Sequence, residues 1–389
     1  MRIQRLYHKY IALKRTPIRD TIWLFIVTRL VLFAVTYFAY LLLTTPTYLA
    51  KIVTVPSLLS AWNLGESTDY IRIARYGYQS LSDFAYFPLY PLLVGAVGNL
   101  TGNYFLVGMI LSNLAFLAAL IFLYHIIAFS IEEKVAHYTI LYYCIFPTSF
   151  YFFTAYNTSF LLLFSVGTFW ALQRRYWWRA GLFGMLASLT SPFGLLLLLP
   201  YLATLIAERR ALFSSVFAFL NGITPLLLFP FCILFINYCA WLATGDRLAL
   251  LTVELQSGRE FTYPWEGIIQ TFSMLFGPHA LPAGSSLQVH LIIDLCITLF
   301  FLVLWVVGLF RLPFRYSLWS FGVLFVLLSF PAQESPDVLQ PNQHMLLLLF
   351  PMLLTLAFQG KKHPGFHQSL FLIFPVFLAL FSITFILQP

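Results

Sequence analysis

Long apolar runs constrain the fold of this chain more than any other feature. The first is TIWLFIVTRLVLFAVTYFAYLLL, and others follow at 84–100, 104–130, 136–153, 156–173, 180–207, 211–244, 290–309, 316–331, 344–359 and 367–387. A helix that crosses a bilayer needs about 20 mainly apolar residues. We therefore predict an all-α polytopic membrane protein with roughly ten to twelve transmembrane helices, formed as one integral membrane domain over residues 1–389.

Clusters of Lys and Arg predict how the chain is oriented. The opening stretch MRIQRLYHKYIALKRTPIRD is basic and precedes the first apolar run, and later clusters lie at 209–210, 311–315 and 361–362. Such clusters stay on the cytoplasmic side of a membrane. We therefore expect a cytoplasmic N-terminus, an uncleaved first helix and two outer loops at 46–83 and 245–289. The net charge of +8 then reflects membrane orientation, and nucleic acid is not expected as a partner.

One part of this topology stays open. If Arg174, Arg175 and Arg179 are also cytoplasmic, the apolar run at 180–207 is a re-entrant hairpin with its tip at 190–194, TSPFG. Otherwise the run is one long helix kinked at its proline, and these arginines face outward. In both cases the break puts non-helical backbone at membrane depth, which requires surrounding protein or a cavity.

The first outer loop contains an unusual concentration of charge. The stretch LGESTDYIRIARYGY at 64–78 places Glu66, Asp69, Arg72 and Arg75 close together, although only 9% of the chain is charged. Its pattern predicts a surface helix, and Asn63 followed by Glu66 has the spacing of a capping box. The same residues also suit a catalytic site, because a carboxylate can take a proton from a hydroxyl and nearby cations can hold a phosphate.

Metal and redox sites are not indicated. The four cysteines lie in apolar runs without C-x-x-C spacing, and His279 and His290 lack the spacing of metal ligands. We therefore expect no metal and no cofactor.

Several ordered motifs resemble the PIG-V type mannosyltransferases. They are DYIRIARYGY, FAYFPLYPLLVG, CIFPTSFYFFTAYNTSFLLLF, RRYWWRAGLFGMLASLTSPFGLLLLLP, ATGDRLALLTVE with YPWE, and HMLLLLFP. The resemblance implies the GT-C fold, a helical bundle with a catalytic cavity on its outer face, and transfer of mannose from a polyprenyl-phosphate carrier. It also implies that Glu66 is the catalytic base, where the family usually has aspartate, with Asp69 assisting or replacing it.

Three motif positions differ from the family. Thr158 replaces an acidic residue, Ser191 replaces an arginine, and His344 stands where an arginine usually precedes the last L-F-P. A serine cannot bind phosphate as a bidentate arginine does, and a histidine carries full charge only when protonated. Candidates for the donor phosphate are therefore His344 together with the arginines Arg72, Arg247 and Arg259.

The sequence thus predicts an inverting, metal-independent glycosyltransferase. Its partners would be a polyprenyl-phosphate sugar, membrane lipids and an acceptor that the sequence does not identify. The short loops favour a bacterial plasma membrane, with the active site on the non-cytoplasmic side. One alternative is a non-catalytic relative that binds a lipid carrier or serves as a subunit of a glycosylation complex, as the altered positions suggest. A lipid-sugar flippase is a weaker alternative, because only one broken helix is evident.

Overall fold

The computed structural model describes residues 16–43, 54–256, 258–278, 280–282, 284–332, 336–340 and 342–387. All regular structure in these ranges is helical, which confirms the all-α prediction. Five helical segments are long and apolar enough to cross a membrane, or six if a bent pair near the C-terminus is one span. The five are α2 (Thr16–Leu43), α6 (Tyr104–Ser130), the segment of α12 (Val216–Ile223), η4 (Thr224–Leu227) and α13 (Leu228–Thr244), α16 (Ser286–Leu309) and α20 (Pro364–Ile386).

Shorter apolar helices of 10 to 17 residues coincide with further predicted spans, so the described residues contain fewer full-length crossings than the ten to twelve predicted. They are α5 (Leu89–Thr101), α8 (Thr158–Gln173), the pair η3 (Pro192–Leu197) and α10 (Leu198–Ala207), and α17 (Phe314–Ser329). Proline or non-helical backbone interrupts some of the predicted spans. For example, the predicted span 136–153 consists of α7 (Glu133–Ile145) followed by η2 (Ser149–Phe152). The backbone between these elements and α8 is buried in protein, where irregular structure can be tolerated.

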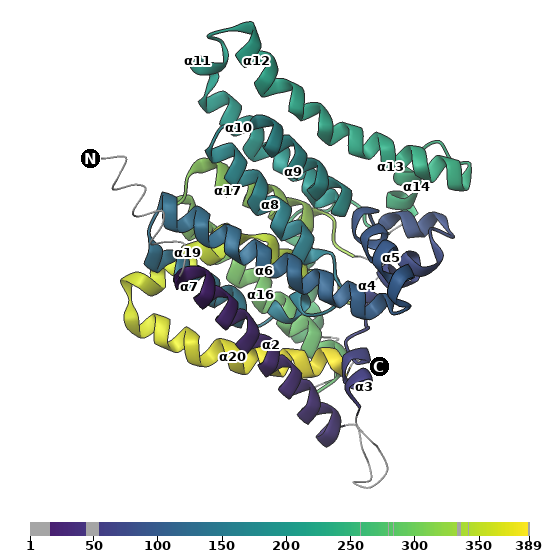
Figure 1. Ribbon diagram of the computed structural model, residues 1–389. Helices are drawn as coiled ribbons and strands as arrows, with labels where there is room; N and C mark the ends of the chain where they lie inside the picture. Colours follow the sequence, from purple (N-terminus) through teal and green to yellow (C-terminus); the bar gives the residue numbers. More distant parts are fainter. Residues whose placement is uncertain are drawn as a thin grey trace.

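The helices run between two ends of the molecule (Figure 1). α2 begins at the left end in this view, α20 runs from left to right, and α8 packs against both α6 and α9 (Trp177–Thr190). The right-hand end carries the short helices α3 (Val55–Ser60) and α4 (Glu66–Tyr76) beside α5. The parts of the predicted outer loops that Figure 1 labels, α3, α4 and α14 (Ala249–Gln256), therefore lie at the right-hand end, opposite the start of α2, whereas residues 46–53 of the first loop lie outside the described residues.

The open question at 180–207 is answered by a hairpin. α9 ends at Thr190, and the chain turns at Ser191 and returns through η3 and α10. Arg175 Nη2, before α9, lies 2.8 Å from Glu208 Oε2, after α10. Because the two ends of this segment form an ion pair, they lie on the same side of the bundle. This arrangement corresponds to the hairpin alternative and excludes one long helix kinked at its proline.

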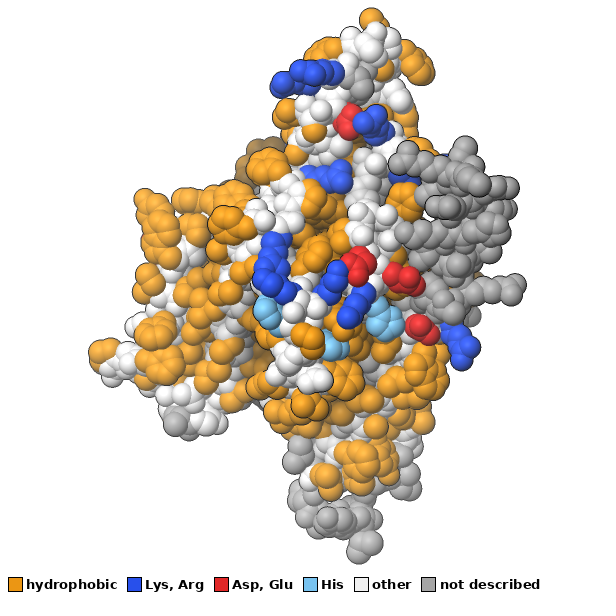
Figure 2. All heavy atoms as spheres, turned by 90° about the vertical axis from the view of Figure 1, so that its left-hand side faces the viewer, with side chains coloured by type: hydrophobic (Ala, Val, Ile, Leu, Met, Phe, Trp, Pro, Cys, Tyr) orange, Lys and Arg blue, Asp and Glu red, His pale blue; other side chains and the backbone are white. Residues whose placement is uncertain are grey.

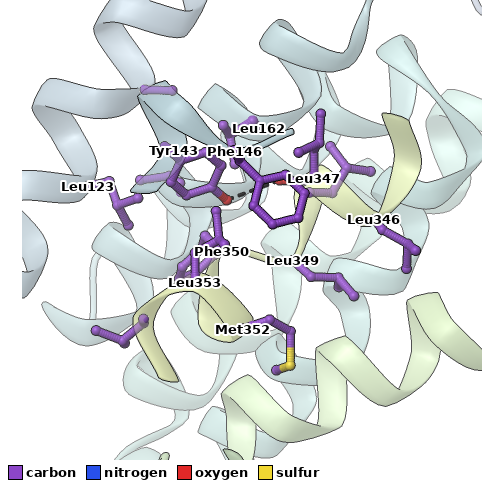
Figure 3. Close-up of a cluster of buried hydrophobic side chains, with 14 of the residues drawn as sticks. Leu123, Tyr143, Phe146, Leu162, Leu346, Leu347, Leu349, Phe350, Met352 and Leu353 are labelled. Carbon is purple, nitrogen blue, oxygen red and sulfur yellow. Dashed lines mark hydrogen bonds between the residues drawn. The ribbon is translucent and has the colours of Figure 1, made fainter. Parts of the chain in front are cut away.

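A second break lies near the C-terminus. α18 (Asn342–Met345) and η5 (Leu346–Leu348) meet α19 (Phe350–Lys362) at an angle of 73°. The Tyr143 hydroxyl donates a hydrogen bond of 3.0 Å to the Leu347 carbonyl at this bend, and Phe146, Leu349 and Phe350 pack around it (Figure 3). The hydroxyl of Tyr143 thus stabilises the bend, because it supplies a hydrogen-bond donor to a backbone carbonyl inside the core. The bend places His344 beside Glu66, at the end of the bundle where α4 begins.

Candidate functional site

Helix α4 begins differently from the prediction. Gly65, with φ of 58°, is its N-cap and makes no side-chain capping bond, so the predicted capping box of Asn63 and Glu66 is wrong. Asn63 Oδ1 instead accepts a hydrogen bond from Ser67 Oγ at 2.9 Å. Glycine can adopt this left-handed conformation without a steric penalty, and it makes Glu66 the first residue of the helix. The Glu66 carboxylate is therefore free of a capping role.

A backbone hydrogen bond fixes the position of Glu66 at the start of α4. Its N–H donates to the Tyr156 hydroxyl at 3.1 Å, which ties α4 to the segment before α8. The side chain is 28% exposed and lines two cavities. Removal from bulk water raises the pKa of Glu66 to about 7, although the charge of Arg259 opposes the shift. A carboxylate with a pKa near neutral pH is suited to general base catalysis.

His344 lies beside this carboxylate. Its Nε2 lies 3.5 Å from Glu66 Oε1, and the ring is only 4% exposed. Within the part of the chain that the structure describes, this Nε2 has no hydrogen-bond partner. The rings of Tyr151 and Tyr156 flank the imidazole, with centroids at 5.3 and 5.4 Å. His344 is thus positioned to contact the carboxylate of Glu66 or a molecule bound beside it.

The larger cavity that Glu66 lines has a volume of about 570 Å³. We call it the Arg259 cavity, because Arg259 is the one arginine or lysine among its described lining residues. Within the described ranges, Arg259 forms no ion pair with a carboxylate. Ser191, at the tip of the hairpin, and Asn157 add polar groups to the wall, and Asn157 is held by a 2.9 Å bond from its Nδ2 to the Thr190 carbonyl. An anion could bind here beside Glu66.

The smaller cavity, the Asp294 cavity, has a volume of about 260 Å³. Among its described lining residues there is no lysine or arginine, whereas carboxylates and amides are frequent. Gln343 Nε2 donates to Asp294 Oδ2 at 2.8 Å, and the Tyr151 hydroxyl donates to Gln343 Oε1 at 3.2 Å. The polar residues of this wall are Glu66, Tyr151, Tyr156, His290, Asp294, Asp337, Gln340, Gln343 and His344. Such a wall suits hydroxyl groups or a cation and repels a phosphate.

The two predicted outer loops meet above the Arg259 cavity. From the first loop, η1 (Leu81–Ala85) contacts α14 (Ala249–Gln256) of the second, and Phe84 packs with Ala249 and Val253. Packing between the two loops brings Arg259, which follows α14, to the cavity that Glu66 lines. The second loop also contains α15 (Glu266–Phe276).

This packing gives a test of sidedness. Single cysteines at Ser82 and Gln256, both exposed, should each react with an impermeant maleimide added outside intact cells in a cysteine-free background, because the basic clusters predict that both loops lie outside. A cysteine at Lys362, exposed at the opposite end, should react only after permeabilisation. Protection of Ser82 or Gln256 in intact cells would contradict the predicted orientation.

Three predicted site residues lie outside both cavities. Arg72 forms ion pairs with Asp69 at 3.0 Å and with Asp83 at 2.9 Å, so two carboxylates neutralise its charge. Asp69 also accepts a bond of 2.8 Å from the Tyr86 hydroxyl. Arg247 is exposed, and its backbone carbonyl accepts from Asn237 Nδ2 at 2.8 Å. The structure thus brings together Glu66, His344, Arg259 and Ser191, but not these three.

Two observations concern residues that the sequence left uncertain or missed. Thr158 is fully buried, and its Oγ1 has no hydrogen-bond partner among the described residues. Asp294 and Gln343 were not predicted to line a site. The available signal was a carboxylate within the otherwise apolar α16, since an ionisable residue at membrane depth is costly and usually has a partner.

Among the described residues, no group of three or more His, Cys, Asp or Glu could hold a metal ion.

No protein-family model matches the chain, and no curated protein sequence matches it either. Among solved structures, the chain is similar to the oligosaccharyltransferase of Archaeoglobus fulgidus. One match is its complex with zinc and sulfate (11% identity, 92% of this chain, 53% of that chain, TM-score 0.42). A second is the form tethered to an acceptor peptide with the NVT sequon (10% identity, 93% of this chain, 55% of that chain, TM-score 0.45). The chain thus spans about half the length of these proteins. TM-scores of this size do not establish a shared fold, so the function has to be inferred from the chain's own site.

Proposed function

We propose that this protein is a membrane glycosyltransferase of the GT-C type that transfers mannose from a polyprenyl-phosphate carrier to an acceptor hydroxyl on the non-cytoplasmic side. The observation that carries the proposal is the position of Glu66. Its carboxylate, with a pKa of about 7, lines both a cavity whose arginine forms no ion pair among the described residues and a cavity without lysine or arginine in its described wall. Glycosyl transfer needs this combination, because one substrate is a phosphate and the other is a hydroxyl compound.

The donor would occupy the Arg259 cavity. Arg259 can form charge-assisted hydrogen bonds to the phosphate, and Ser191 and Asn157 can donate to sugar or phosphate oxygens. Of the four residues predicted from sequence to bind phosphate, Arg259 is the one that lines this cavity. His344 lines the other one, so we assign it to orienting the Glu66 carboxylate rather than to the donor phosphate.

The acceptor would occupy the Asp294 cavity. Asp294 and Gln343 are already hydrogen-bonded to each other, so their remaining polar atoms are oriented before a ligand binds. Carboxylate and amide oxygens accept hydrogen bonds from sugar hydroxyls, while the absence of lysine and arginine from the described wall disfavours a phosphate. Glu254 also lines the Arg259 cavity, so the feature that would direct the phosphate to this cavity is the guanidinium of Arg259, which has no counterpart in the described wall of the Asp294 cavity.

The reaction would be a single displacement. Glu66 takes the proton of the acceptor hydroxyl, whose oxygen attacks the anomeric carbon of the donor. The bond between that carbon and the carrier phosphate breaks, and Arg259 stabilises the phosphate that leaves. A displacement from the opposite face inverts the anomeric configuration. No metal is required in this scheme, because the leaving group is already a phosphate held by a cation.

The direct test is transfer by the purified protein. In lipid nanodiscs it should transfer label from polyprenyl-phosphate mannose to at least one fraction in a panel of membrane acceptor extracts. Donor binding without any transfer would instead favour the non-catalytic carrier-binding alternative, for which the buried Thr158 in place of an acid is the supporting observation.

The pH dependence of transfer is a second test of the same site. Because the base acts in its deprotonated form, kcat/KM should rise with pH up to about 7, the pKa of Glu66, and level off above it. The profile should be measured between about pH 5.5 and pH 8.5, with donor binding recorded at each value. A flat profile across this range would remove Glu66 from the role of base.

A further inference from the structure

A third polar cavity lies at the end of the bundle opposite Glu66. α8 begins beside the Arg259 cavity, where Asn157 is a lining residue, and ends at this third cavity. The helix has 16 residues, so at about 1.5 Å per residue the two sites are about 24 Å apart. We call this site the α8–α9 cavity. It has a volume of about 510 Å³ and is lined by Ile18, Ile121, Phe122, His125, Ala128, Phe129, Trp170, Arg174, Tyr176 and Arg179.

Two arginines in this cavity are held by aromatic rings. The guanidinium of Arg174 lies 4.8 Å from the ring centroid of Trp170 and 5.6 Å from that of Phe129. Arg179 lies 4.8 Å from the centroid of Tyr176 and 6.0 Å from that of Trp170. Stacking against a ring uses the face of a guanidinium and leaves its N–H edges available. Both arginines can therefore donate to the same bound group.

These two positive charges have no carboxylate partner among the described residues. Their neighbour Arg175 pairs with Glu208 at 2.8 Å, but neither Arg174 nor Arg179 makes an ion pair there. No lining residue is acidic, and residues 1–15 contain no Asp or Glu. Two cations gathered around one indole ring, with His125 in the same wall, attract an anion. Paired N–H groups on planar guanidinium favour phosphate among the common anions.

The rest of the wall is apolar. Ile18, Ile121, Phe122 and Ala128 offer hydrocarbon surface, and the exposed Phe129 stands at the edge. Figure 2 shows this end of the molecule, where blue and pale-blue basic side chains lie among orange hydrophobic ones, with a few red acidic side chains beside them. A soluble anion would gain nothing from such walls, whereas a lipid offers a phosphate to the arginines and acyl chains to the apolar surface.

We propose that the α8–α9 cavity binds the phosphate of an anionic phospholipid from the leaflet at this end of the bundle, the leaflet that the basic clusters predict to be cytoplasmic. The bound lipid would link the ends of α2, α6 and α8 to the start of α9. Because α9 leads directly to Ser191, the lipid would also anchor the hairpin whose tip lines the Arg259 cavity.

The experiment measures lipid binding to the purified full chain. Delipidated protein is titrated with phosphatidylglycerol, and retained lipid is counted by native mass spectrometry alongside thermal unfolding. The double variant Arg174→Gln/Arg179→Gln should lower the affinity at least about tenfold and reduce the lipid-dependent rise in unfolding temperature. The matched control, Arg209→Gln/Arg210→Gln, removes the same charge from exposed positions at the same end and should bind within about twofold of the unmodified protein.

Further ligands identify which chemical group the cavity recognises. Inorganic phosphate and glycerol phosphate should give no comparable stabilisation, and phosphatidylcholine should bind more weakly than phosphatidylglycerol. Equal protection by inorganic phosphate would make this a soluble-anion site, and equal loss in both double variants would reduce the effect to surface charge. Either outcome would overturn the proposal. Arg174→Lys/Arg179→Lys keeps the charge and should bind with intermediate affinity, so it provides a test if the glutamine variant does not fold.

Discussion

Replacing Glu66 by glutamine should lower transfer roughly 10²- to 10⁴-fold while leaving donor binding intact. Glutamine has nearly the same shape but cannot accept the proton of the acceptor hydroxyl. The change should not disturb the start of α4, because Gly65 is the N-cap and the bond to Tyr156 comes from the backbone N–H of Glu66. Transfer from labelled donor and equilibrium donor binding are the two measurements.

The same variant should alter how stability depends on pH. The folded-state pKa of Glu66, about 7, lies above its ordinary value of 4.5. The folded protein therefore binds this proton more tightly than the unfolded chain, and the unmodified protein loses stability as pH rises between these values. Glutamine carries no charge to desolvate, so Glu66→Gln should be at least as stable as the unmodified protein at pH 8. The measurement is the unfolding temperature of the variant and of the unmodified protein at pH 5 and at pH 8.

Asp69→Asn is the matched control for Glu66→Gln. Asp69 is the other acidic residue in the first turn of α4, but it lines neither cavity: it pairs with Arg72 and accepts from the hydroxyl of Tyr86, which belongs to the wall of the Arg259 cavity. Its replacement should lower transfer less than about tenfold, since an exposed ion pair contributes little. Full transfer by Glu66→Gln together with a large loss in Asp69→Asn would exchange the two roles.

Arg259→Gln has the second large expected effect, a loss of donor affinity of roughly 10- to 100-fold. Glutamine can still donate a hydrogen bond but brings no charge to the phosphate. Because the charge of Arg259 lowers the pKa of Glu66, its removal should also move the midpoint of the pH profile upward. Arg259→Lys should keep the midpoint near its original value and recover part of the affinity. Donor titrations and kcat/KM profiles give both quantities.

Arg247→Gln is the control for this substitution. Arg247 belongs to the same outer loop but is exposed and lines neither cavity. Its loss should change donor affinity by less than about twofold. If Arg247→Gln weakens donor binding as strongly as Arg259→Gln, the loop acts through its general charge, and the Arg259 cavity loses its assignment as the donor site.

The sequence alone was sufficient for features that depend on local pattern. Apolar runs of this length can satisfy their backbone in a membrane only as helices, which is why the all-α class followed without a structure. The unusual density of charge at 64–78 likewise pointed to Glu66 in a chain with few charges. The turn at Ser191 was also among the alternatives, because the proline in Thr-Ser-Pro-Phe-Gly kinks or breaks a helix.

Tertiary structure decided which polar groups meet. The expected capping box did not form, because the hydroxyl of Tyr156, 90 residues further along, takes the first N–H of α4. Arg72, a plausible phosphate ligand by spacing, is neutralised by Asp69 and Asp83. His344 and Arg259 are both candidates for phosphate binding in the sequence, yet the bend at Leu349 and the packing of the two outer loops put them in different cavities. A charge's role depends on its neighbours within a few ångströms, and in a folded bundle those neighbours come from distant parts of the chain.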